Sequence, residues 1–322
     1  MPVVEKDVYN RLFFIFFKKN IMKINIEWLL STVPVIRINN IQDNEVYALL
    51  EKYNIVGSVK IKTVYRILKD AYEKWLLKKN MIILEASSWN TAIALAYLGN
   101  LFKMKTKIIL PKTTSITKKK LIESYGAEII EIDGTTDMGI KLRDKMGKEH
   151  PGKYFLPDQF GNYANFRAHY HLTGPYILDK LGKIDFFVAG LWTSGTLLGA
   201  GKYLKEHLPD IKIIWINPVD RIEGLRNFKT TDIIIPFFED HKDIIDETID
   251  VNFDTHVISW VKNYLDEWYF VGISSGAIIS WTKVYLEKKS GLKWVIMAPD
   301  WGNFYMETLM THLDKTDFIK TN

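Results

Sequence analysis

Residues 81–102 read MIILEASSWNTAIALAYLGNLF, a short apolar run that passes through a polar loop into a longer apolar segment. The run at 81–84 is typical of a buried parallel strand, because it is short and apolar on both faces. The segment at 90–102 has the length and composition of a helix. A strand that leads directly into a helix is the unit from which open parallel sheets are built.

The same alternation of strand and helix continues through the rest of the chain, and no linker rich in Gly, Pro or Ser interrupts it. We expect further strands at 107–110, 127–132, 154–156, 185–189, 211–216 and 292–298. We expect further helices at 59–79, 114–125, 138–149, 165–181, 196–207, 255–268 and 277–288. This pattern predicts an α/β protein with an open, doubly wound, mainly parallel sheet and any second lobe packed closely on the first.

The composition narrows the possible functions. With 322 residues, 47% hydrophobic and 25% charged, the chain can bury a sizeable core and is not disordered. It has no cysteine, which excludes disulfides, thiolate metal sites and a cysteine nucleophile, and fits a cytoplasmic protein. A net charge of +5 without a basic stripe argues against nucleic acid as a partner.

The apolar run LFFIFF at 12–17 is too short to cross a membrane, which takes about 20 residues. It predicts an amphipathic lead-in helix that docks either on the body of the protein or on a second subunit. We therefore expect no membrane association, and leave the role of residues 1–22 open.

Three predicted strand-to-helix junctions are rich in small and hydroxyl residues, at 85–91, 191–196 and 271–277. Helix starts offer free backbone N–H groups and attract anions. Since neither a Walker A motif nor G-x-G-x-x-G is present, the predicted anion is not the phosphate of a nucleoside triphosphate or a dinucleotide. No metal-binding pattern is found either, because His169 and His171 point to different faces of their predicted helix.

Lys60 lies in the first turn of a predicted helix, after the turn at 54–59. A cation there opposes the helix macrodipole. Lys60 is therefore either a solvated surface lysine or an amine whose charged form is destabilised, as a nucleophile or Schiff-base partner requires.

Six segments, in order from about Trp28 to Tyr305, resemble motifs of the cysteine synthase and cystathionine β-synthase family, which are fold type II pyridoxal-phosphate enzymes. The matching segments are NIVGSVK at 54–60, SSWNT at 87–91, QFGNYAN at 159–165, TSGT at 193–196, GISSGA at 272–277 and PDWGNFY at 299–305.

The resemblance implies a two-lobed fold with a smaller lobe at 48–158 and a larger lobe of 1–47 and 159–322. It implies pyridoxal 5′-phosphate as cofactor and a small amino acid as substrate. The implied reaction is β-replacement on a serine- or cysteine-type amino acid through an α-aminoacrylate intermediate, foremost O-acetylserine plus sulfide to cysteine. Family members are usually homodimers.

The resemblance also implies residue roles. Lys60 would bind the cofactor's aldehyde carbon and move the substrate's α-proton. The remaining assignments are Thr193, Ser194, Gly195 and Thr196 to the phosphate, Asn90 to the ring oxygen, Ser274 to the pyridine nitrogen, and Ser87, Ser88, Trp89, Thr91, Gln159 and Gly224 to the substrate.

Several residues depart from the family pattern. Trp89 and Trp192 replace glycines, so their indoles either pack outward or reshape the pocket. Phe304 replaces an arginine, and Tyr163 replaces a proline. These changes leave open a degenerate member that binds the cofactor without turnover.

Glu223 stands in a loop where the family carries glutamine or proline before a glycine. It is either a general base on an incoming water or thiol, or a solvated carboxylate paired with Arg221 or Arg226. The first interpretation favours the alternative reaction, in which cysteine is consumed and hydrogen sulfide is released.

Overall fold

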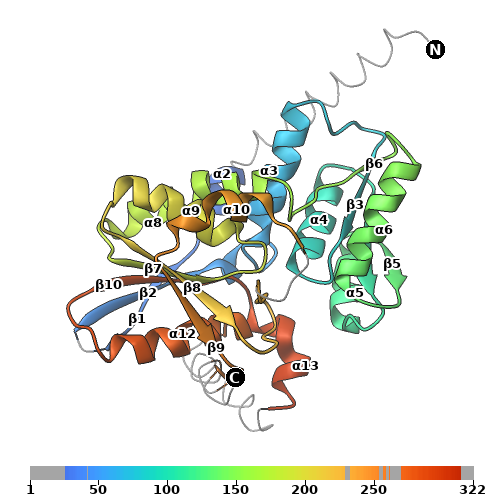
Figure 1. The fold of residues 1–322 in the computed structure, drawn as a ribbon. Coiled ribbons are helices and arrows are strands. Elements are labelled where there is room, and N and C mark those ends of the chain that lie inside the picture. The colour runs from blue at the N-terminus through green and yellow to red at the C-terminus, as the bar shows by residue number, and fades with distance from the viewer. Residues whose placement is uncertain are drawn as a thin grey trace. The chain divides into compact units, whose positions relative to one another are not determined.

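The computed structural model describes residues 26–41, 43–228, 233–253, 257–258, 261 and 270–312. The described chain divides into two compact units, a smaller one of residues 26–31 and 64–162 and a larger one of 32–63 and 163–312 (Figure 1). The segment at 1–22 and most of the helix expected at 255–268 lie outside the described residues.

The described strands are β1 Val35–Ile41, β2 Asn44–Leu50, β3 Ile82–Ala86, β4 Thr106–Pro111, β5 Glu128–Ile132, β6 Tyr154–Phe155, β7 Phe186–Gly190, β8 Lys212–Pro218, β9 Glu247–Val251 and β10 Lys293–Ala298. The described α-helices are α2 Ile26–Ser31, α3 Lys60–Glu73, α4 Asn90–Leu101, α5 Ile116–Ser124, α6 Thr136–Glu149, α7 Ala164–Ala168, α8 Gly174–Leu181, α9 Gly195–His207, α10 Pro236–His241, α12 Ile273–Leu286 and α13 Met306–Leu309. Short 3₁₀ or π turns are η1 Glu51–Tyr53, η2 His169–Thr173, η3 Lys242–Ile244 and η4 Gly302–Tyr305.

The smaller unit contains a parallel sheet with the strand order β5-β4-β3-β6 among its described residues. Helix α6 covers the face that presents Leu84, Ala86 and Ile109, and α4 contacts β3 and β4 from the other side (Figure 1). Gly139 allows this close packing, because a Cβ there would lie 3.3 Å from both Ala86 and Ile109. Uniformly apolar strands are expected when helices cover both faces of a sheet.

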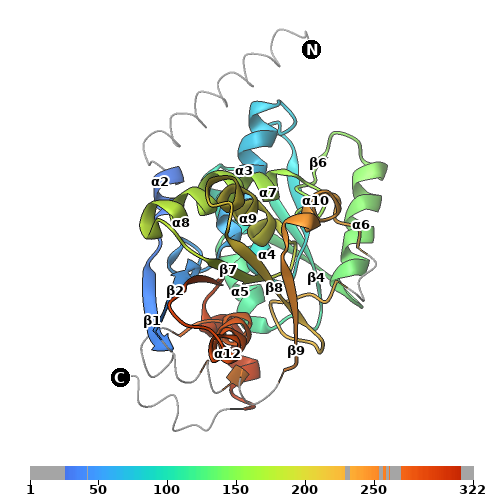
Figure 2. The same cartoon turned by 60° about the vertical axis from the view of Figure 1, so that its left-hand side comes forward.

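The larger unit contains a sheet with the strand order β1-β2-β10-β7-β8-β9 among its described residues. β1 pairs antiparallel with β2, and every other pairing in this sheet is parallel. Helices α8 and α9 lie on one face and α12 lies on the other, as the turned view also shows (Figure 2). The predicted fold class, an open and mainly parallel sheet flanked by helices, is confirmed for both units.

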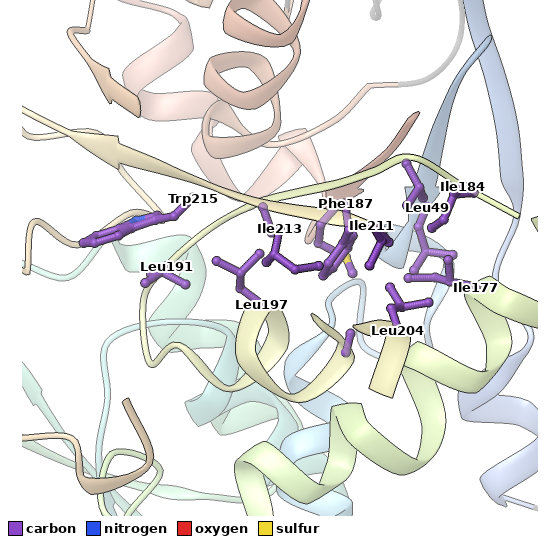
Figure 3. Close-up of a cluster of buried hydrophobic side chains, with 14 of the residues drawn as sticks. Leu49, Ile177, Ile184, Phe187, Leu191, Leu197, Leu204, Ile211, Ile213 and Trp215 are labelled. Atoms are coloured by element: carbon purple, nitrogen blue, oxygen red, sulfur yellow. The ribbon is translucent and has the colours of Figure 1, made fainter. Parts of the chain in front are cut away.

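The core of the larger unit lies between its sheet and the helices α8 and α9 (Figure 3). Phe187, Ile213 and Val295 point into it from three neighbouring strands, and Leu197 and Leu204 meet them from α9. The intervening strand residues face α12, where the rings of Phe186 and Trp294 stack with their centroids 3.7 Å apart. This alternation follows from the two-residue period of a strand.

The predicted helix at 165–181 is α7, η2 and α8 in direct succession, so one π turn interrupts an otherwise continuous helical segment. None of the helices in the described ranges is long and apolar enough to span a membrane.

The strands that the sequence pattern did not predict are β1, β2 and β9. In β2 buried and half-buried residues alternate at its start, and β9 carries three exposed residues. The predicted lobe boundary at residue 48 falls inside β2, which pairs with β10, so residues 48–63 pack with the larger unit.

Candidate active site

The parallel strands of the larger unit bring several predicted site segments to one edge of its sheet. Lys60 follows β2, the loop 191–194 follows β7, Glu223 and Gly224 follow β8, and the segment from Pro299 follows β10. Because these strands are parallel neighbours, their carboxyl ends meet at the same edge. Ligands of open α/β sheets bind at that edge.

The turn before Lys60 is held by backbone bonds and by a glycine. Gly57 has φ +73°, and a Cβ there would lie 3.1 Å from the ring of Phe304. The amide of Val59 donates to the carbonyl of Pro299 over 2.8 Å. The backbones of Ser58 and Asp300 pair as an isolated antiparallel β-bridge. The segment that carries the lysine is therefore tied to the segment after β10.

Lys60 is the first residue of α3, as the sequence predicts. Burial lowers the pKa of its ammonium group from 10.5 to about 8, although the negative charge of Asp300 opposes the shift. The position at a helix N-terminus disfavours a cation further. The neutral amine, which is the form that acts as a nucleophile or base, is therefore a minor form at pH 7 but is far more abundant than in a lysine of ordinary pKa.

Lys60 lines a cavity whose walls lie wholly within the larger unit. Trp192 is part of the same wall, so this tryptophan lines the pocket. The lining residues are Val59, Lys60, Gly190, Trp192, Thr193, Ser194, Thr196, Gly224, Leu225, Ile278, Met297 and Pro299.

The loop after β7 ends at the N-terminus of α9. Ser194 precedes this helix in the left-handed conformation, with φ 62° and ψ −16°, and Gly195 is its first residue. The first N–H groups of a helix have no partner within it and lie at its positive end. Together with the hydroxyls of Thr193 and Thr196 on the cavity wall, they can bind a phosphate.

Ser274 and Gly224 lie close together. Gly224 has φ +87°, and a Cβ there would lie 3.1 Å from the hydroxyl of Ser274 and 2.9 Å from that of Tyr305. Ser274 is fully buried, and its hydroxyl makes no hydrogen bond of ordinary geometry with the described residues. Of these two residues, Gly224 lies on the cavity wall.

Tyr305 and Asp300 were not among the predicted site residues, although they lie in the segment 299–305. The Tyr305 hydroxyl donates to the Asp300 carboxylate. Burial, together with the charges of Asp300 and Glu223, raises the pKa of Tyr305 well above its ordinary value. Tyr305 is therefore a neutral hydrogen-bond donor beside Ser274.

Glu223 lies next to this group of residues. Its carboxylate accepts a hydrogen bond from the hydroxyl of Thr308 over 2.9 Å. The guanidinium of Arg226, one of the two partners considered for it, lies over the ring of Trp192 at 4.9 Å from the centroid.

The other predicted residues lie in the smaller unit, in the loop after β3 and after β6. Thr91 donates to the side-chain oxygen of Gln159 over 2.6 Å, so these two are joined directly. The amide of Trp89 donates to the hydroxyl of Ser87 over 3.4 Å. Ser88 lies 3.4 Å from the hydroxyl of Thr136, and Asn90 begins α4.

The indole of Trp89 is held by a lysine of the same unit. The Nζ atom of Lys118 lies 3.0 Å from the centroid of the Trp89 ring, and Lys118 is nearly buried. Cation–π contact of this kind stabilises both groups.

A buried ion pair supports Gln159, and sequence reasoning missed it. The Glu85 carboxylate accepts from Arg143 over 2.7 Å and from the backbone amide of Gln159 over 3.3 Å. Arg143 also donates to Asp158, the residue before Gln159. The sequence does contain a signal for this ion pair, because Glu85 follows a uniformly apolar strand. A carboxylate buried at such a position requires a partner.

The chain belongs to the pyridoxal-phosphate dependent enzyme family, whose model matches residues 29–293. A cysteine synthase of Aquifex aeolicus is 33% identical over 300 residues, which are 88% of this chain and 90% of that protein. The fold type and the cofactor predicted from the sequence motifs are confirmed.

Solved structures of related enzymes share the fold over nearly the whole chain. A hydrogen sulfide-producing enzyme of Fusobacterium nucleatum has a TM-score of 0.81 and 30% identity, covering 87% of this chain and 97% of that one. An O-ureido-L-serine synthase has a TM-score of 0.83 and 26% identity, covering 90% of this chain and 96% of that one. The chain is thus a pyridoxal-phosphate enzyme that resembles cysteine synthases.

The residues at the cavity fit this cofactor. An amine with a lowered pKa and a helix start with hydroxyls beside it, both on the cavity wall, match its aldehyde and phosphate groups in chemical type. The buried hydroxyl of Ser274, which lies beside Gly224 of that wall, matches the pyridine nitrogen in chemical type.

Proposed function

We propose that the protein catalyses β-replacement on a serine-type amino acid, converting O-acetyl-L-serine and sulfide to L-cysteine and acetate. The observation that carries this proposal is Lys60, an amine with a pKa of about 8 on the wall of a cavity that also holds a predicted phosphate cradle. The similarity to cysteine synthases supports it.

The balance of the reaction is simple. The α-proton and acetate leave the substrate, and the sulfide sulfur bonds to the β-carbon while a proton returns to the α-carbon. When bound, pyridoxal phosphate supplies an electron-withdrawing ring that lowers the cost of removing the α-proton. In this proposal the Lys60 amine holds the cofactor's aldehyde carbon and, once released, accepts and returns that proton.

Residues of the larger unit are assigned to the cofactor. Thr193, Ser194, Gly195 and Thr196 bind its phosphate at the start of α9, where the helix dipole favours an anion. Ser274 binds the pyridine nitrogen. A neutral hydroxyl there leaves the ring nitrogen largely unprotonated, which favours loss of a β-substituent over transamination.

Residues of the smaller unit are assigned to the cofactor's ring oxygen and to the substrate. Asn90 donates to the ring oxygen. The α-carboxylate is bound by donors in the loop after β3 together with Gln159. These donors are Ser87, Ser88, Trp89 and Thr91, and Gly224 of the larger unit is assigned as a further substrate contact.

A second reaction is favoured by Glu223. The Glu223 carboxylate accepts a hydrogen bond from Thr308, and its negative charge contributes to the raised pKa of Tyr305. A carboxylate in this position can take a proton from an incoming nucleophile. In this second reaction L-cysteine loses hydrogen sulfide from its β-carbon. Addition of water at that carbon gives serine, and addition of a thiol gives the corresponding thioether. The similarity to a hydrogen sulfide-producing enzyme supports this alternative.

The remaining proposals concern partners and location. We infer a homodimer in the cytoplasm, as is usual for the family, with symmetric subunits. Nucleic acid and membranes are not part of the proposal, since the net charge is small and no basic stripe is present.

The test measures both reactions on the cofactor-loaded protein. Cysteine formation from O-acetyl-L-serine and sulfide is compared with sulfide release from L-cysteine. Faster cysteine formation supports the first reaction, and faster sulfide release establishes the second in its place. Absence of both activities in protein that carries the cofactor would contradict the proposal and leave a degenerate, cofactor-binding member.

Glu223→Gln then tests the role of the carboxylate, with Glu239→Gln as a matched control. Glu239 is an exposed glutamate of the same unit that pairs with Lys242. If Glu223 is the base, its variant loses turnover of L-cysteine while cofactor binding is unchanged. Equal turnover in both variants would remove Glu223 from the reaction.

A further inference from the structure

A buried polar network joins the helix of Lys60 to the threonines of the predicted phosphate cradle. Its centre is His169, a fully buried residue in the π turn η2. Its Nε2 atom lies 3.2 Å from the hydroxyl of Thr196 and 3.3 Å from that of Thr63, and its Nδ1 atom lies 3.0 Å from the hydroxyl of Thr173. Thr63 is one helical turn beyond Lys60.

Asn165 extends the network to the second cradle threonine. Its side-chain oxygen accepts from the hydroxyl of Thr63 over 2.9 Å, and its side-chain nitrogen donates to the hydroxyl of Thr193 over 2.8 Å. Thr193 thus accepts a hydrogen bond from inside the protein. Its own proton is left for a group on the cavity side.

Glycines of α9 make room for this network. A Cβ at Gly195 would lie 2.3 Å from the side-chain oxygen of Asn165. A Cβ at Gly199, one turn later, would lie 3.0 Å from the Cβ of His169 and 2.3 Å from the carbonyl oxygen of Phe166. Gly195 therefore permits close approach of α9 to α7, and Gly199 permits close approach to the start of the π turn.

The hydrogen-bond directions define the tautomer of His169. Burial and the charges of Lys62 and Lys60 hold its pKa well below the ordinary value, so the ring is neutral and carries one N–H. The proton of Thr63 goes to Asn165, which leaves the Thr63 oxygen as an acceptor toward Nε2. We therefore assign the proton to Nε2, where it is shared between the hydroxyl oxygens of Thr63 and Thr196, and assign Nδ1 as the acceptor from Thr173.

We propose that His169 and Asn165 are positioning residues that turn the hydroxyls of Thr196 and Thr193 into hydrogen-bond donors aimed at the cofactor phosphate. Each threonine oxygen accepts from the buried network, so that its proton is directed to the anion. Preorganised donors bind an anion more tightly than freely rotating ones, because their orientation costs nothing at binding. The inference rests on the proposed assignment of both threonines to the phosphate.

The test compares pyridoxal 5′-phosphate with pyridoxal, which has the same aldehyde but no phosphate. Each is titrated into the full chain freed of cofactor, and binding is followed by absorbance. His169→Leu is expected to weaken binding of pyridoxal phosphate about 10-fold to 100-fold, the value of a hydrogen bond to a charged group, and to leave pyridoxal binding unchanged.

Two further comparisons distinguish orientation from general damage. His169→Gln can place an amide N–H at the position of Nε2 and is expected to restore most of the affinity, whereas His169→Asn cannot reach it. If the leucine variant does not fold, the difference in pyridoxal phosphate affinity between His169→Gln and His169→Asn tests the inference in its place. In a double-mutant cycle, His169→Leu should add little once Thr196→Val has removed the hydroxyl.

Thr282→Val is the matched control, since Thr282 is a buried threonine of the same unit whose hydroxyl donates to the carbonyl of Ile278. It should change the affinity for neither ligand. Equal weakening of both ligands by His169→Leu, or no weakening, would overturn the inference. If Thr196→Val itself leaves pyridoxal phosphate binding unchanged, the assignment of the phosphate cradle fails, and the inference fails with it.

Discussion

The catalytic role proposed for Lys60 has a cost in stability that can be measured without any substrate. Burial disfavours the charged form of this amine, and the first turn of α3 adds to the penalty. Lys60→Met keeps most of the side-chain volume and removes the charge. We expect this variant, free of cofactor, to be more stable than the natural protein at neutral pH.

The size of the effect follows from the pKa. A fall from the ordinary 10.5 to about 8 corresponds to about 3 kcal/mol against the charged form. Below pH 8 both the folded and the unfolded chain carry the proton, so the whole penalty is present. Between pH 8 and 10.5 the unfolded chain binds more protons, and the stability of the natural protein therefore rises with pH relative to the variant.

The assay is urea unfolding of both cofactor-free proteins at about pH 7 and about pH 9.5. The variant should be more stable by about 3 kcal/mol at the lower pH and by about 1.5 kcal/mol at the higher pH. Lys242→Met, which changes an exposed lysine of the same unit, should stay within about 0.5 kcal/mol of the natural protein. A Lys60 variant that is less stable at neutral pH, or whose difference does not depend on pH, would refute the reasoning.

Three further changes test other parts of the site. Arg143→Met leaves the buried Glu85 carboxylate without its ion-pair partner and should cost about 3–5 kcal/mol in urea unfolding; a cost below about 1 kcal/mol would contradict the buried pair. Gly224→Ala places a Cβ at φ +87° and 2.9 Å from a buried tyrosine hydroxyl, so thermal unfolding should show a loss of about 1–2 kcal/mol, and unchanged stability would speak against this conformation. Lys118→Met removes the cation over Trp89 and should cost about 1 kcal/mol and change the tryptophan fluorescence, whereas an unaltered spectrum would argue against the contact.

The parallel core of the fold was predictable because its strands carry a strong signal. β4, β7 and β10 are apolar on both faces, and the structure places them within one or two residues of the expected ranges. β1 escaped prediction because its sequence, VIRINNI, mixes apolar and polar residues as an edge strand does. β2 escaped as well, since it joins the parallel part of the larger sheet only through a pairing with the distant β10.

Motif spacing predicted which residues are candidates for chemistry, but could not predict what holds them. Contacts such as His169 with Thr196 join residues 27 positions apart, and Arg143 reaches Glu85 across 58. The sequence shows only that such polar residues exist, and the chain must fold before they become partners. Lys118 is an example, because a lysine in a basic run is expected on the surface. In the structure it is nearly buried against the ring of Trp89.

The central claim is that Lys60 holds pyridoxal phosphate, and an absorption spectrum tests it most directly. Lys52→Ala is the matched control, because burial lowers the pKa of Lys52 to about 8 as well. We predict a visible cofactor band in the natural protein and in Lys52→Ala after reconstitution, and its loss in Lys60→Ala. A band that persists in Lys60→Ala, or that is absent from the reconstituted natural protein, would contradict the account.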